Sequence, residues 1–186
     1  MTFHQRVALG ALSLVLLSQS SGAQATATPQ QICARRDSLA RNTPGTSVDD
    51  AFEIAARLLP GGFGGLTTTY FFLKQPALAD TARGIARTLA ACTQDEWRRL
   101  WEIVQHADVR QGQYDWTELR RWYALLLTIE NAGWRSADID EGVNRLSYEF
   151  ATSGALEAFR TRAEALGVPA AAVILKLEKG VRWPVR

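Results

Sequence analysis

The order of strand and helix patterns in the C-terminal half of the chain limits its possible folds more than any other feature. Strands alternate apolar and polar side chains, whereas amphipathic helices repeat their apolar side chains every three or four residues. Between Ala107 and Lys179 these periods predict strand, helix, strand, strand, helix and strand. The six segments are ADVRQGQY, WTELRRWYALLLTIENA, WRSADID, NRLSYEF, SGALEAFRTRAEALG and AAVILKLEK. Two crossovers onto one antiparallel sheet give the βαββαβ, ferredoxin-like arrangement.

The preceding part of the chain predicts a smaller lobe of helices and one β-hairpin. Between glycines and a proline lies FGGLTTTYFFLKQP, whose threonines and aromatics indicate a pair of strands or one bent strand. Helical spacing of apolar residues occurs in QQICARRDSLARN, VDDAFEIAARLL, ALADTARGIARTLAAC and EWRRLWEIV. We therefore expect an α+β protein with a helical and hairpin lobe over residues 26–105. A ferredoxin-like lobe with an extended tail is expected over residues 106–186.

The first 25 residues have the layout of a secretory signal peptide. Arg6 precedes an apolar run over residues 7–17, and the small-x-small sequence at 23–25 predicts cleavage after Ala25. The run is shorter than the roughly 20 residues that span a bilayer, so we expect no membrane span in the mature chain. The protein should then be exported, to the periplasm or beyond.

Charge composition argues against one class of partner. The chain has 21 Lys and Arg and 19 Asp and Glu, and only Arg6 of these lies in the predicted leader. The mature chain is therefore almost neutral, without the excess of basic residues that nucleic-acid binding requires. We expect no nucleic-acid partner.

Cys33 and Cys92 are the only cysteines in the chain. An even number in an oxidising compartment predicts a disulfide, here closing a loop of about 60 residues. A metal site is the alternative, but outside the leader the chain has a single histidine, His106, to complete it.

The stretch DIDEGVNRLSYEF partly matches the pattern of a calcium-binding loop. Four oxygen-bearing residues fall at loop positions 1, 3, 7 and 12, namely Asp138, Asp140, Asn144 and Glu149. Position 6, which requires glycine, is Val143, and the flanks alternate as strands do. The stretch therefore predicts a hairpin with its turn at residues 141–144, where glycine and asparagine tolerate a positive φ.

The glycine-rich PGGFGG, residues 60–65, resembles a phosphate-binding loop only superficially. Such loops lie between a strand and a following helix, or continue with lysine and a hydroxyl residue. Here a helix precedes and a strand follows, with Leu66 and Thr67 after the last glycine. We expect these glycines to permit a close backbone approach or a bulge.

Catalytic chemistry finds little support in the sequence. Nucleophilic catalysis would need His106 together with a serine, of which the candidates are Ser136, Ser147 and Ser153. No nucleophile-elbow pattern is present. The carboxylates of Asp138 and Asp140 could act as acid and base, although strand carboxylates are most often a solvated face. We predict no catalytic, cofactor or metal site.

The C-terminal tail follows the last predicted strand. Pro184 restricts the backbone, so the tail should be extended. Trp183 has no evident core to join, and either folds back on the sheet or is offered to a partner; the sequence leaves both open. The predicted partner-binding tail comprises Val181, Arg182, Trp183, Pro184, Val185 and Arg186.

Four segments in this order resemble an exported bacterial domain, the pro-region of α-lytic and other trypsin-like serine proteases. They are PGGFGG with its following strand, VRQGQYDWTELRRW, DIDEGVNRL and ALGVPAAAV, spread over residues 48–180. The hairpin after Gly65 is shorter than in that family, and the family does not require the cysteine pair. The resemblance implies a non-catalytic domain whose sheet lies against a protease. The segment after its last strand, here residues 180–186, would enter the active-site cleft.

No protease domain follows in this chain. We therefore expect an exported protein-binding domain that acts in trans, as an inhibitor or folding helper of a secreted serine protease or another envelope protein. The alternatives are an exported enzyme that uses His106 or surface carboxylates, and a structural protein of the envelope.

Overall fold

The computed structural model describes residues 27–43, 48–94 and 97–178, and shows a mixed α+β protein with two three-stranded sheets. The predicted signal peptide, residues 1–25, and the predicted tail, residues 181–186, lie outside the described residues. The helices are α1 (Pro29–Asn42), α2 (Val48–Leu58), α3 (Ala79–Cys92), α4 (Arg98–His106), α5 (Trp116–Leu127) and α6 (Ser153–Ala165). The strands are β1 (Phe63–Leu66), β2 (Tyr70–Leu73), β3 (Asp108–Gln111), β4 (Trp134–Asp140), β5 (Arg145–Phe150) and β6 (Val173–Leu177). Two short 3₁₀ helices, η1 (Pro76–Leu78) and η2 (Ala170–Ala172), complete the described elements.

The sheets differ from the prediction in one strand. β3 pairs in parallel with β2, so the first sheet has the order β1-β2-β3 and the second the order β4-β5-β6. The predicted ferredoxin-like sheet, with β3 beside the later strands, is therefore not formed, and β3 joins the lobe before the predicted boundary at residue 105. An isolated two-stranded hairpin is marginally stable. β3 adds a third strand to the β1–β2 hairpin by pairing with β2, and α3 and α4 connect β2 to β3 along the chain.

The two sheets share one topology that no sequence repeat indicates. Each consists of an antiparallel hairpin, a helical connection and a third strand parallel to the second. The connections explain the pairing, because tight turns join antiparallel strands and a parallel neighbour requires a longer crossover. A helix also precedes each hairpin, α2 in the first lobe and α5 in the second.

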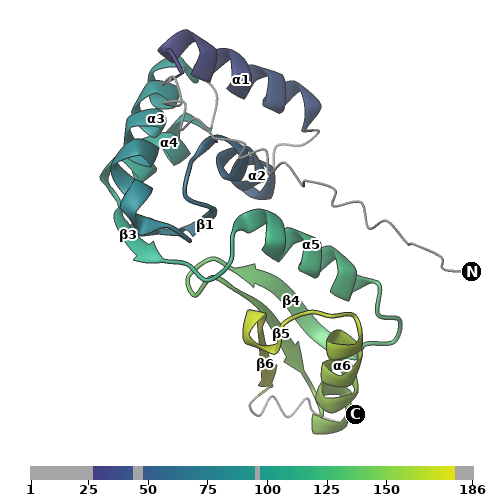
Figure 1. Cartoon of the computed structure of the whole chain (residues 1–186). Coiled ribbons are helices and arrows are strands. Elements are labelled where there is room, and N and C mark those ends of the chain that lie inside the picture. The colour runs from purple at the N-terminus through teal and green to yellow at the C-terminus, as the bar shows by residue number, and fades with distance from the viewer. Residues whose placement is uncertain (1–26, 44–47, 95–96, 179–186) are drawn as a thin grey trace, which may run out of the picture.

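Helix α5 lies between the two lobes and joins them into one core (Figure 1). A reciprocal capping box begins it: the Asp115 carboxylate accepts from the Glu118 N–H, and the Glu118 carboxylate accepts from the Asp115 N–H. Trp116 packs edge to face on Phe52 of α2, with ring centroids 4.8 Å apart. Trp122 packs likewise on Tyr114, at 5.0 Å. These buried aromatics make the interface between lobes part of the core.

The predicted disulfide is confirmed. Cys33 of α1 is bonded to Cys92, the last residue of α3, and their Cα atoms lie 6.2 Å apart. A disulfide is consistent with an exported protein, because exported proteins fold in oxidising compartments. Among the described helices, none is long and apolar enough to cross a membrane.

Candidate functional site

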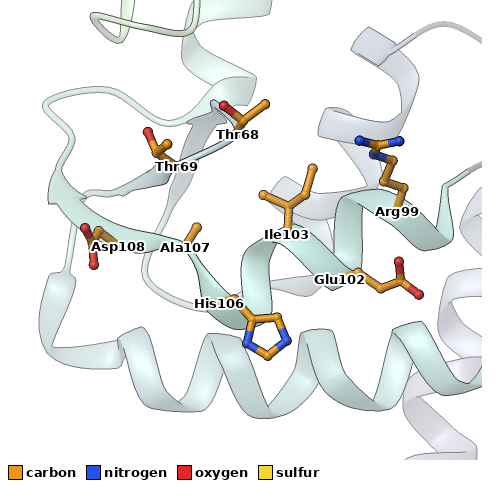
Figure 2. Close-up of a pocket in the computed structure, with 8 residues that line it drawn as sticks. All are labelled: Thr68, Thr69, Arg99, Glu102, Ile103, His106, Ala107 and Asp108. Atoms are coloured by element: carbon orange, nitrogen blue, oxygen red, sulfur yellow. The ribbon is translucent and has the colours of Figure 1, made fainter.

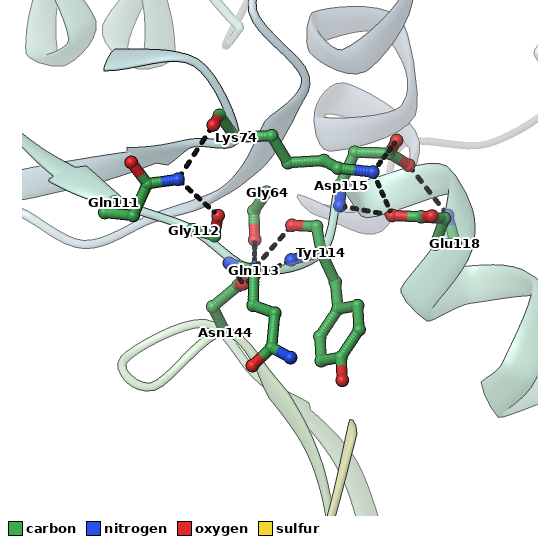
Figure 3. A network of polar contacts seen from close by, with 9 residues as sticks. All are labelled: Gly64, Lys74, Gln111, Gly112, Gln113, Tyr114, Asp115, Glu118 and Asn144. Carbon is green, nitrogen blue, oxygen red and sulfur yellow. Dashed lines mark hydrogen bonds and ion pairs between the residues drawn. The ribbon is translucent and has the colours of Figure 1, made fainter. Parts of the chain in front are cut away.

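Three of the sequence motifs meet at the side chain of Asn144 (Figure 3). Asn144 ends the turn between β4 and β5, with φ at +55° and only 1% of its surface exposed. Its Oδ1 accepts from the N–H groups of Gln113 and Tyr114, at 2.9 and 3.0 Å. Its Nδ2 donates to the carbonyls of Gly64 and Tyr114, at 2.7 and 2.9 Å. An amide offers two donors and two acceptor sites, so every one is used. Asn144 thereby fixes the second sheet to the first lobe.

The glycines around Asn144 allow this close approach. A Cβ added to Gly64 would lie 2.4 Å from the carbonyl oxygen of Tyr114 and 2.5 Å from Nδ2 of Asn144. Earlier in the same motif, Gly61 and Gly62 have positive φ. PGGFGG thus forms a turn, and the close backbone approach expected of its glycines is found at Gly64.

Replacing Gly64 with alanine should lower the free energy of unfolding by about 3 kcal/mol or more, because backbone and a buried amide must move apart. Gly84 is the matched control: it lies within α3, and a Cβ there would meet nothing within 4 Å. Gly84→Ala should raise stability by about 0.5 to 1 kcal/mol through helix propensity. Urea denaturation of both variants checks this. If both variants change the free energy of unfolding equally, the close packing around Gly64 does not require glycine.

Lys74 lies next to the junction and connects β2 to the start of α5. Its Nζ lies 2.9 Å from Oε2 of Glu118 and 3.7 Å from Oδ2 of Asp115. The hydrogen bond to Glu118 raises the pKa of Lys74, outweighing burial, which lowers it. Burial works to raise the pKa of Glu118, but the hydrogen bonds from the Asp115 N–H and from Lys74 outweigh it, and the pKa is lowered. The two carboxylates of the capping box, Asp115 and Glu118, thus also form an ion pair with Lys74 that links the lobes.

Removing this lysine should raise the pKa of the Glu118 carboxyl. A carboxyl whose pKa is lowered by folding adds stability above its unfolded pKa, and this is lost as pH falls through the folded pKa. In Lys74→Met that loss should begin at a higher pH, which NMR titration of the Glu118 carboxyl would measure. Lys176→Met, at an exposed position of β6, should leave the titration unchanged. An unaltered Glu118 titration in Lys74→Met would contradict the assignment of Lys74 as its partner.

Further contacts bind the β4–β5 turn to the first lobe. The Tyr70 hydroxyl of β2 donates to the carbonyl of Gly142 at 2.9 Å, and the Arg110 guanidinium lies 3.5 Å above the Tyr70 ring. Asp140 accepts from the Gly142 N–H within the turn itself. The predicted hairpin is confirmed, with Asn144 rather than Gly142 taking the positive φ.

In the described part of the chain, no group of three or more His, Cys, Asp and Glu side chains could hold a metal ion.

The second sheet has one covered face and one polar face. Tyr148 of β5 marks the covered face: its ring contacts Tyr123 of α5 and Phe159 of α6, with centroids 6.3 and 4.7 Å apart. Side chains of alternate register point the other way and are exposed or half-buried. We call this surface the open face, and its members are Ser136, Asp138, Ser147, Glu149, Ile174 and Lys176.

Within its sheet, β6 pairs only with β5, and is therefore an edge strand. A groove of about 200 Å³ lies between it and α6, lined by the apolar side chains of Val168, Val173 and Leu175, with Arg160 and Glu164 among the other lining residues. The edge of β6 thus combines backbone groups of an edge strand with apolar surface beside it.

His106 lies in a different part of the molecule from the serines considered as its partners. It ends α4 and lines an open hollow of about 720 Å³ with Thr68, Thr69, Arg99 and Asp108, among others (Figure 2). Ser136, Ser147 and Ser153 are not among the residues of this hollow. Ser136 instead donates to Glu149 across the open face, at 3.4 Å. The structure therefore does not bring the histidine and these serines together.

Sequence reasoning missed the role of Asn144. The sequence predicts Asn144 only as part of a turn, where asparagine tolerates a positive φ. Its partners come from residues 64, 113 and 114, so no pattern near Asn144 in the sequence indicates them.

Comparisons of the chain with family models, with curated proteins and with solved structures find no match. The function of the chain is therefore inferred from its own surfaces. Of these, the edge of β6 belongs to the last described strand before the predicted tail, residues 181–186.

Proposed function

We propose that this protein is an exported, non-catalytic binding domain that docks on a secreted serine protease or another envelope protein in trans. The open face of the second sheet and the edge of β6 are the docking surface. The observation that carries the proposal is the arrangement of this sheet: two helices cover one face, while the other stays polar and accessible.

An edge strand is a common place for a partner to add a strand, since its unpaired backbone groups provide affinity and neighbouring pockets provide specificity. β6 has such an edge beside an apolar groove. Leu177, the last residue of β6, is 47% exposed. A partner strand along β6 would cover this side chain.

The junction around Asn144 supports the proposal indirectly. A docking sheet binds best when it is held in place before the partner arrives, because less freedom is then lost on binding. The polar network and α5 hold the second sheet against the first lobe. The first lobe would then serve as a rigid support for the docking sheet.

The tail extends the proposed surface. We propose that residues 181–186 leave the end of β6 in an extended form and enter a peptide-binding cleft of the partner, with Trp183 as anchor. One well-placed aromatic anchor contributes about 1 to 3 kcal/mol of binding free energy. The ferredoxin-like sheet is not needed for this role, because the three strands of the second sheet suffice.

Inhibition of trypsin-like serine proteases of bacterial secretions tests the proposal directly. The purified protein should inhibit hydrolysis of a chromogenic peptide substrate, and deletion of residues 181–186 should weaken inhibition at least about tenfold without changing the melting temperature. Charge reversal on the open face, Asp138→Lys, should also weaken it. Asp80→Lys, at a fully exposed side chain of α3, is the matched control and should have no effect.

Two outcomes would overturn the proposal. If deletion of the tail lowers stability by about 1 to 3 kcal/mol while binding stays intact, Trp183 packs on its own sheet instead. If no secreted protease or other exported protein binds, or if binding is equal in the Asp138 and Asp80 variants, the open face is not a docking surface.

A further inference from the structure

A second surface lies on the first lobe, away from the proposed docking sheet. A cleft of about 980 Å³ opens between the N-terminal half of α1, the C-terminal end of α2 and the first turns of α3. Four larger aliphatic side chains are among its lining residues: Ile32, Leu58, Leu59 and Ile85. Leu58 and Leu59 are largely buried in the core, so only a small part of each faces the cleft, whereas Ile32 and Ile85 are half-buried.

The charged residues of the cleft have one sign. Arg35 and Arg57 both line it, and none of the lining residues is Asp or Glu. Arg35 donates to the carbonyl of Arg57 at 3.1 Å, which places its guanidinium across the end of α2. A guanidinium has five N–H donors, so this bond leaves Arg35 able to bind a ligand. Arg57 is also paired with Glu53, so Arg35 is the stronger candidate for an anion.

We propose that this cleft binds an amphipathic anion, a single aliphatic chain that ends in a carboxylate. The chain lies over the aliphatic side chains, and the carboxylate accepts hydrogen bonds from Arg35. Small-molecule sites are typically about 300 to 1,000 Å³, mostly apolar, with a few placed polar groups, and the cleft matches this description. The proposal is independent of the docking function, because none of its residues belongs to the second sheet.

The disulfide supports one wall of this cleft. Among the described side chains of α1 only that of Arg36 is buried, while Ile32, Leu39 and Ala40 are half-buried against the core. The bond from Cys33 to Cys92 adds a covalent link between α1 and α3, which form two of the walls of the cleft.

Calorimetric titration of the purified, disulfide-bonded protein with decanoate tests the proposal. Decanoate should bind saturably at one site, and octanoate should bind about tenfold more weakly because it buries two fewer methylenes. Decanol and decyltrimethylammonium have the same chain without the anion, and both should bind more weakly than decanoate.

Arginine variants distinguish binding of decanoate in the cleft from its nonspecific attraction to positive charges elsewhere on the surface. Arg35→Gln should weaken decanoate binding about fivefold, as expected for loss of one exposed ion pair. Arg41→Gln, in the last turn of the same helix and outside the cleft, should leave it unchanged. Absence of saturable decanoate binding, equal binding of the cationic probe, or equal effects of the two variants would each overturn the proposal. None of these results bears on protease inhibition, so the two proposals fail separately.

Discussion

Replacing Asn144 with glycine is expected to lower the free energy of unfolding by about 3 to 4 kcal/mol. Four hydrogen bonds are lost, and the backbone groups of Gly64 and Tyr114 lose their partner in a buried place. Glycine adopts the φ of +55° without strain, so the variant isolates the side-chain network from the backbone conformation. Urea denaturation, followed by tryptophan fluorescence, measures the difference.

Asn131 is the matched control for this experiment. It also has a positive φ, +52°, but its side chain is exposed and outside the junction. Asn131→Gly should change stability by no more than about 0.5 kcal/mol, as for most surface substitutions. If both variants lose the same stability, the turn conformation and not the network explains the effect. A loss of stability in the Asn144 variant alone would show that the hydrogen bonds of this side chain stabilise the contact between the lobes.

Removing the disulfide should have an effect of similar size. The double variant Cys33→Ser/Cys92→Ser should be less stable by about 4 kcal/mol, because the unfolded chain is released from a loop of 59 residues. The urea midpoint of the variant should fall well below that of the oxidised protein. Limited proteolysis should then cut first within α1, which has little buried surface of its own.

Reduction supplies the control for the cysteine variants. Dithiothreitol should bring the unmodified protein to nearly the same urea midpoint as the double serine variant, and should leave the variant itself unchanged. A midpoint that does not respond to reduction would mean that the bridge contributes nothing to stability. A variant much less stable than the reduced protein would show that the serines, rather than the missing bond, disturb the helices.

Local patterns in the sequence predicted most of the elements. Apolar spacing predicted the six helices, and alternation predicted β4 and β5 with the turn between them. These predictions succeeded because each depends on residues a few positions apart, whose periodicity and backbone preferences act locally. The disulfide followed from cysteine number and the expected compartment, without any knowledge of distance.

The partner of β3 could not be read in the same way. DVRQ alternates weakly and is exposed at three of its four positions, so its pattern indicates a strand but no neighbour. Both β2 and the later strands offered an edge. The four-residue parallel register with β2 is a property of two edges that meet only in the folded chain. The ferredoxin-like prediction failed at this choice.

By itself, the sequence determined the kinds of elements in this protein, their order, and which cysteines could be joined. Only the tertiary structure decided which edges pair and what the motifs do. Asn144 shows the reason: it is an ordinary turn residue in the sequence, yet its partners lie 30 to 80 residues away. A hydrogen bond over that separation forms only after the intervening helices and strands have packed. Its contribution therefore depends on the whole fold and leaves no local pattern.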